Sequence, residues 1–121
     1  MPNKVTFDTV RKIGLTLPGV VVGTTYGVQS LKVDGQILAC PAINKSAEPG
    51  SLGIAVDMDR RAELLEGDPA TYYITDHYVP YSYVLVRLSK VNPDVLKDLL
   101  LMSWKFVTSK KSSRKRARRS R

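Results

Sequence analysis

The net positive charge of this 121-residue chain lies entirely in its last twelve residues, which read KKSSRKRARRSR. These twelve residues carry eight Lys or Arg side chains and no acidic one, whereas the other 109 residues hold 11 basic and 11 acidic side chains. A segment so charged, with no apolar side chain larger than alanine, cannot bury enough surface to offset the entropy of ordering. We therefore expect an electrically neutral folded domain over residues 1–109 and a basic tail over 110–121 that is disordered when free.

The neutral part is long enough to form its own core, because a domain of this size buries roughly two-thirds of the surface that its unfolded chain exposes. Cys40 is the single cysteine, which excludes an internal disulfide. The start of the chain, MPNKVTFDTV, has no long apolar run typical of a signal segment. No apolar cluster approaches the ~20 residues of a membrane-spanning helix. These features predict a cytoplasmic protein that does not enter a membrane.

Apolar spacing and capping residues predict three helices. Apolar residues recur at helical spacing from Phe7, which predicts a helix over about 6–17. Asp57 is a typical N-cap for the short segment MDRRAELLEG. Asn92 as N-cap and Pro93 at the first helical position open a final helix whose apolar stripe ends at about residue 108.

Five segments rich in β-branched and aromatic residues predict strands, namely SLKV, QILAC, SLGIAVD, TYYIT and YSYVLVRL. The first two are joined by Asp34-Gly35, a strong signal for a hairpin with a type I′ turn. The order of elements is then α-βββ-α-ββ-α. This order predicts an α+β fold in which helices cover an antiparallel sheet of about five strands.

Two blocks of sequence carry a family resemblance. The first is LPGVVVGTTYG at residues 17–27 with LKV at 31–33, and the second is TDHYVPYSYVLVRL at 75–88. Together with the element order they resemble the MmcQ/YjbR family of small bacterial proteins, over about residues 5–108. The resemblance implies a fold likened to the double-wing DNA-binding motif and to secretion chaperones, and a role as a predicted DNA-binding protein. The chain departs from the family pattern at Val28-Gln29 and at Ser82, where a proline is usual.

The basic tail is the strongest functional signal, because a basic run on a neutral domain is typical of an arm that binds a polyanion. Eight engaged cations would give a log–log salt dependence with a slope of up to about seven on duplex DNA. DNA is the first candidate partner and RNA the second, with a solubility arm or an anionic lipid surface as alternatives. The predicted nucleic-acid contacts are Lys110, Lys111, Arg114, Lys115, Arg116, Arg118, Arg119 and Arg121.

The neutral domain offers a weaker set of candidate contacts. Five tyrosines fall between residues 72 and 83, and alternation along the last strand places Tyr81, Tyr83 and Arg87 on the face opposite Val84 and Val86. We expect these rings to pack against a helix and the cations to belong to an ordinary solvated surface. The alternative is that the rings face outward beside Arg87, a ring-and-cation arrangement that can stack on bases. The candidate contacts are Lys32, Lys45, Arg60, Arg61, His77, Tyr78, Tyr81 and Arg87.

The sequence has few side chains that could serve catalysis or bind a metal ion. His77 beside Asp76 could serve acid–base chemistry, but the chain has one histidine and one cysteine, and no third group that would complete a catalytic set. No Cys or His spacing predicts a metal site, and no glycine-rich phosphate loop is present. We expect a non-catalytic protein without metal or cofactor. The alternative to nucleic-acid binding is a small-ligand or protein-interaction domain that uses the Tyr-rich loop 76–83.

Overall fold

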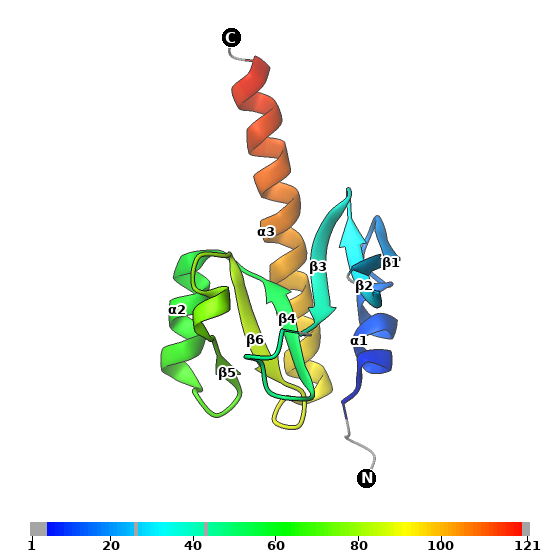
Figure 1. The fold of residues 1–121 in the computed structure, drawn as a ribbon. Coiled ribbons are helices and arrows are strands. Elements are labelled where there is room, and N and C mark those ends of the chain that lie inside the picture. The colour runs from blue at the N-terminus through cyan, green and yellow to red at the C-terminus, as the bar shows by residue number, and fades with distance from the viewer. Residues whose placement is uncertain (1–4, 26, 43, 120–121) are drawn as a thin grey trace.

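A computed structural model of the chain describes residues 5–25, 27–42 and 44–119, with side chains through Ser109. The six strands are β1 (Val20–Thr25), β2 (Val28–Val33), β3 (Gln36–Pro41), β4 (Ser51–Ala55), β5 (Tyr72–Tyr73) and β6 (Tyr83–Arg87). They form one antiparallel sheet in the order β1-β2-β3-β4-β6-β5. The α+β fold with an antiparallel sheet is therefore confirmed (Figure 1).

The sheet has one strand more than expected, at its first edge. Thr25 pairs with Val28, so the chain turns back within two residues, and Gly27 there has a φ of +81° that favours glycine. The second turn of the meander is as predicted. Asp34 and Gly35 both have positive φ, at 53° and 78°, as a type I′ turn requires.

The helices are α1 (Phe7–Gly14), α2 (Met58–Gly67) and α3 (Pro93–Arg119), with a short 3₁₀ turn η1 at Asp76–Tyr78. Both predicted caps are confirmed, because Asp57 Oδ1 accepts from the Arg60 amide at 2.7 Å and Asn92 Oδ1 accepts from the Val95 amide at 2.9 Å. The first helix ends earlier than residue 17. Its last residues close tighter turns, in which the amide of Leu17 bonds to the carbonyl of Gly14.

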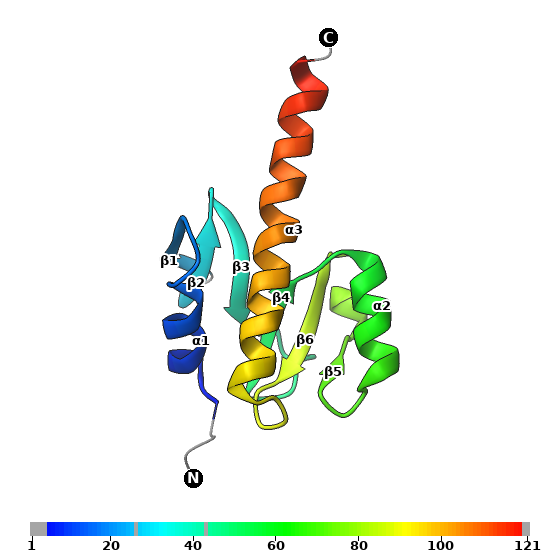
Figure 2. The same ribbon diagram turned by 180° about the vertical axis from the view of Figure 1, so that it is seen from behind.

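The hydrophobic core lies between the sheet and α3, with α1 packed beside α3 on the same face (Figure 2). Leu96, Leu100 and Val107 are buried against strand residues such as Leu38 and Leu52. Two polar groups add specific contacts. The Ser103 hydroxyl donates to the Leu38 carbonyl at 3.3 Å, and Trp104 Nε1 donates to the Pro18 carbonyl at 2.8 Å. These contacts hold α3 along the sheet.

The other face of the sheet, at β3, β4 and β6, is not open to solvent. Two loops lie over it, the β3–β4 loop and the segment that precedes η1. The Ser46 and Thr75 hydroxyls hydrogen-bond at 2.7 Å and join the β3–β4 loop to the segment before η1. Leu85, between core-facing Val84 and Val86, is itself fully buried. β6 is therefore buried on both faces. The tyrosine-bearing face of β6 is thus packed, as expected, but two segments distant in sequence meet over it.

The third helix continues past the sheet. We expected it to end near residue 108, but α3 runs to Arg119 and projects beyond the rest of the domain (Figure 1). Lys, Arg and Ala are good helix formers, and no Gly or Pro follows residue 93 within the helix. Residues 110–119, expected to be irregular, are therefore helical in the structure. The division into a neutral domain and a basic tail at residue 109 stays a prediction. Within the described residues, no helix is long and apolar enough to cross a bilayer.

Candidate nucleic-acid interface

The basic segment occupies the projecting end of α3, which we call the arm (residues 110–119). The sequence places seven of the eight predicted phosphate contacts on it, and the eighth, Arg121, lies outside the described residues. The projecting end of α3 leaves the domain on the side opposite to the start of α1 (Figure 2). The arm is therefore carried on a helix whose first half is fixed in the core. A polyanion can approach it without displacing any part of the sheet.

At the base of the arm lies a hollow of about 760 Å³ between α2 and α3. Its apolar lining includes Leu101 and Met102, and charged residues of both signs surround it: Asp57, Arg60, Asp98 and Lys105. Two acids and two bases leave this surface balanced. The hollow therefore does not extend the positive charge of the arm onto the domain.

Arg61, one of the candidate phosphate contacts, is instead engaged with the Tyr-rich loop. Its guanidinium donates to the carbonyls of Tyr81 at 2.8 Å, Val79 at 3.2 Å and Tyr78 at 3.3 Å. It also donates to the Tyr83 carbonyl at 3.5 Å, so one planar cation on α2 binds four backbone acceptors, a geometry that a lysine could not reproduce. Arg61 therefore fixes the loop that follows η1.

Replacing Arg61 with methionine should destabilise the fold by about 1–3 kcal/mol, because several loop carbonyls lose their donor. Arg60 offers a matched control one residue earlier, since its side chain is exposed and, among the contacts described, pairs only with Glu63 at 3.2 Å, while its backbone contact to Asp57 survives the substitution. Urea unfolding of Arg61→Met and Arg60→Met measures both effects. Equal stabilities of the two variants would contradict the structural role assigned to Arg61.

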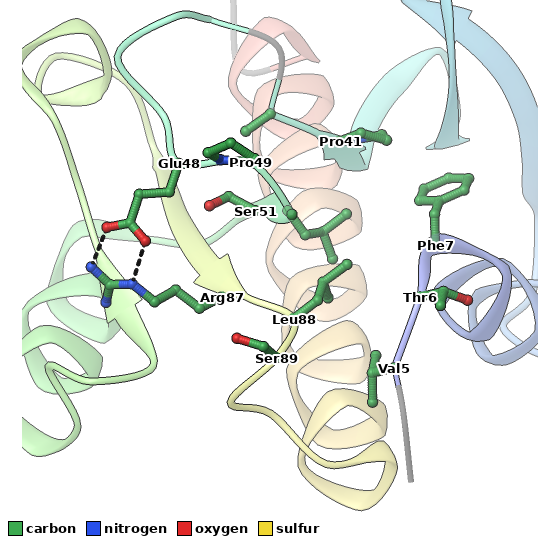
Figure 3. Close-up of a pocket in the computed structure, with 13 residues that line it drawn as sticks. Val5, Thr6, Phe7, Pro41, Glu48, Pro49, Ser51, Arg87, Leu88 and Ser89 are labelled. Atoms are coloured by element: carbon green, nitrogen blue, oxygen red, sulfur yellow. Dashed lines mark hydrogen bonds and ion pairs between the residues drawn. The ribbon is translucent and has the colours of Figure 1, made fainter. Parts of the chain in front are cut away.

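Arg87 is likewise committed to internal contacts. Its Nε and Nη2 atoms donate to the two carboxylate oxygens of Glu48 at 2.9 and 2.7 Å (Figure 3). The guanidinium carbon lies 4.2 Å from the centroid of the Tyr73 ring, and Nη1 donates to the Ala70 carbonyl at 3.0 Å. The ring that Arg87 contacts is therefore Tyr73 on β5, rather than the Tyr81 or Tyr83 ring considered from the sequence, and its ion pair with Glu48 joins the β3–β4 loop to the sheet. Arg87 lies on the face of β6 opposite the core-facing Val84 and Val86, as the alternation predicts, but its guanidinium is engaged by Glu48, and its contact with nucleic acid stays a prediction.

Sequence reasoning missed Glu48, the partner of Arg87. The two residues are 39 positions apart, and only the pairing of β4 with β6, in which Ser51 lies opposite Arg87, brings them together. Tyr73 completes the cluster, because its hydroxyl accepts from the Glu48 amide at 2.8 Å. No local pattern in the sequence signals this arrangement.

The pair also makes stability depend on pH. The hydrogen bond from Arg87 lowers the pKa of the Glu48 carboxyl below its ordinary value of 4.5. The pair therefore stabilises the fold above that ordinary value, and its contribution is lost as the pH falls through the lowered pKa. Glu48→Gln should be slightly less stable than the parent at neutral pH and equally stable in strong acid. Urea unfolding at both pH values checks this, with the exposed Glu66→Gln as control, and a difference that persists in acid would contradict it.

A second hollow, of about 630 Å³, lies beside this pair, between the start of α1 and the β3–β4 loop (Figure 3). Phe7, Pro41 and Leu88 contribute apolar surface, and Ser51 and Ser89 contribute hydroxyl groups. Among the described residues that line it, the one cation is Arg87, which is bound to Glu48. These residues therefore offer no uncommitted cation to attract a phosphate.

The remaining basic candidates do not form one patch. Lys32 is half-buried on β2, where the aliphatic part of its side chain lies over Gly23 of β1. Lys45 is exposed in the β3–β4 loop. Arg60 lies at the start of α2. The structure separates these cations rather than gathering them. Their contact with nucleic acid stays a prediction.

His77 and its neighbours form a small aromatic group at η1. The His77 ring lies edge-on to Tyr78, with centroids 4.9 Å apart, and tilts against the exposed Tyr81 at 6.1 Å. Burial is the main cause of a raised pKa for the Tyr78 hydroxyl. Residues 76–83 line neither hollow described above. Nothing in this geometry favours the loop as a ligand site.

Cys40 lies half-buried on β3, and its thiol contacts the Pro41 carbonyl at 3.4 Å. Burial raises the pKa of this thiol, so it is protonated at neutral pH and a weak nucleophile. Among the described residues, no group of three or more His, Cys, Asp or Glu side chains is placed to hold a metal ion.

Comparison with known proteins adds a family and a fold. The YjbR family model matches residues 15–106. The structure is similar to the crystal structure of Deinococcus radiodurans protein DR2400, which carries a family-model domain called DUF419. The TM-score is 0.72 at 25% sequence identity, covering 89% of this chain and 82% of that chain. Among curated proteins, none matches. The arm begins after residue 106 and so lies outside the family match.

Proposed function

This chain belongs to the YjbR family, and we propose that it is a non-catalytic protein that binds nucleic acid, DNA in preference to RNA, through the arm. The observation that carries the proposal is the separation of charge: eight cations and no acid follow residue 109, on and just beyond a helix that projects from a neutral domain. Phosphate groups are the acceptors that such a cation array binds, with release of counterions.

The proposed binding is largely independent of base sequence. Base reading requires side chains that reach base edges in a groove, whereas Lys and Arg arrays on an arm contact phosphates. The three arginines proposed as contacts on the domain are less available to phosphates, because Arg61 and Arg87 are held by internal partners and Arg60 pairs with Glu63. The arm is thus the proposed affinity determinant.

Fluorescence anisotropy with labelled duplexes of unrelated sequence tests this proposal. We expect the full chain to bind all of them at low salt with similar affinity, and an RNA duplex less tightly. A strong preference for one sequence would move recognition to the domain. The absence of binding at low salt would overturn the proposal altogether.

A further inference from the structure

The helical path of the arm restricts how its cations can be presented. Positions 110, 114 and 118 are four residues apart, as are positions 111, 115 and 119, and residues at this spacing share a side of a helix. Six of the seven basic positions of the arm therefore form two adjacent rows. The other side of the helix is occupied by positions 112, 113 and 117, which are Ser, Ser and Ala, together with Arg116, the one basic residue outside the rows.

The basic rows continue a particular side of α3. Within the domain, the side of α3 buried against the sheet carries Leu96, Leu100, Ser103 and Val107. Helical steps of three or four from Val107 lead to positions 110 and 111, and further such steps lead to 114 and 118. The side that is apolar over the sheet is therefore basic where the helix has left the sheet.

The residue types in the arm favour one class of nucleic acid over others. Proteins that bind single strands combine cations with aromatic side chains on which bases stack. No aromatic residue follows Phe106 in this chain. A helix with basic rows and no stacking platform is suited to the phosphates of a duplex, and the major groove of B-form DNA is wide enough to admit a helix. The major groove of an RNA duplex is too narrow for this.

We propose that the arm binds B-form DNA as a continuous helix lying in the major groove, with the two basic rows contacting the phosphates that border it. This inference rests on the proposed function and adds the conformation of the arm and the class of its partner. Like charges four residues apart weaken the helix of the arm in the free protein without abolishing it, and DNA phosphates neutralise them. Binding therefore stabilises the helix that the arm already forms and raises its population.

Variants with unchanged charge test the role of the helix. The double substitution S112P/A117P interrupts the helix and keeps every cation, and S112A/A117S is its matched control. A second variant, K111S/S112K/S113R/R114S, keeps the composition and moves two cations off the basic rows. Each protein is titrated with a labelled B-form duplex and with a single strand of equal length, and helix content is followed by far-ultraviolet circular dichroism.

We expect the parent chain to prefer the duplex over the single strand by about tenfold or more, a difference of about 1.4 kcal/mol. The proline variant should lose most of this preference and the gain in helix content, and the rearranged variant should bind the duplex more weakly. If all variants bind both probes as the parent does, the helical inference is wrong while the proposed function stands. If no protein binds either probe, the proposed function fails, and this inference with it.

Discussion

Ending the chain after Ser109 is expected to lower its affinity for duplex DNA at low salt by at least about a hundredfold, because most of the phosphate contacts are removed. The melting temperature should stay the same. The hydrophobic core described here contains no residue beyond Val107, and the deleted segment follows it. Anisotropy titrations and thermal unfolding of the two proteins measure the two quantities.

The matched control for this truncation changes cations on the domain. Lys32→Gln with Lys45→Gln removes two positive charges at separated positions and leaves the arm intact. We expect this variant to lose only a small part of the affinity. If it binds as weakly as the truncated chain, the domain rather than the arm holds the nucleic acid.

Leu100→Ala is expected to destabilise the fold by about 2–5 kcal/mol, because it leaves a cavity where α3 meets the sheet. Leu100 is fully buried, whereas its neighbour Leu101 is 38% exposed. The same substitution at Leu101 should change stability by only about 0.5 kcal/mol or less. Urea unfolding of both variants measures this contrast. Similar losses would mean that α3 presents a different side to the sheet.

Local rules of the sequence predicted the parts of the fold that depend on neighbouring residues. The N-caps Asp57 and Asn92 and the Asp34-Gly35 turn are confirmed because each follows from backbone needs within a few residues. The first edge strand was not expected as a separate strand, since its two-residue turn lacks the Asn-Gly or Asp-Gly signal.

The roles of the arginines could not be predicted, because they depend on contacts between distant segments. In the sequence, Arg61 and Arg87 cannot be told from ordinary solvent-exposed cations. In the structure, Arg61 binds backbone carbonyls that include two 17 and 20 residues away, and Arg87 binds Glu48, 39 residues away. The end of α3 was misplaced for a different reason. The absence of packing partners suggested disorder, whereas the helix follows the local propensity of Lys, Arg and Ala.

The salt dependence of duplex binding, measured with the full chain and with residues 1–109, tests most directly whether the arm binds phosphates. For the full chain we predict that log affinity falls linearly with log salt concentration, with a slope of up to about seven if all eight cations engage. The shorter chain should show a slope near zero and little affinity at any salt concentration. A steep slope retained by residues 1–109, or a flat one in the full chain, would contradict the account.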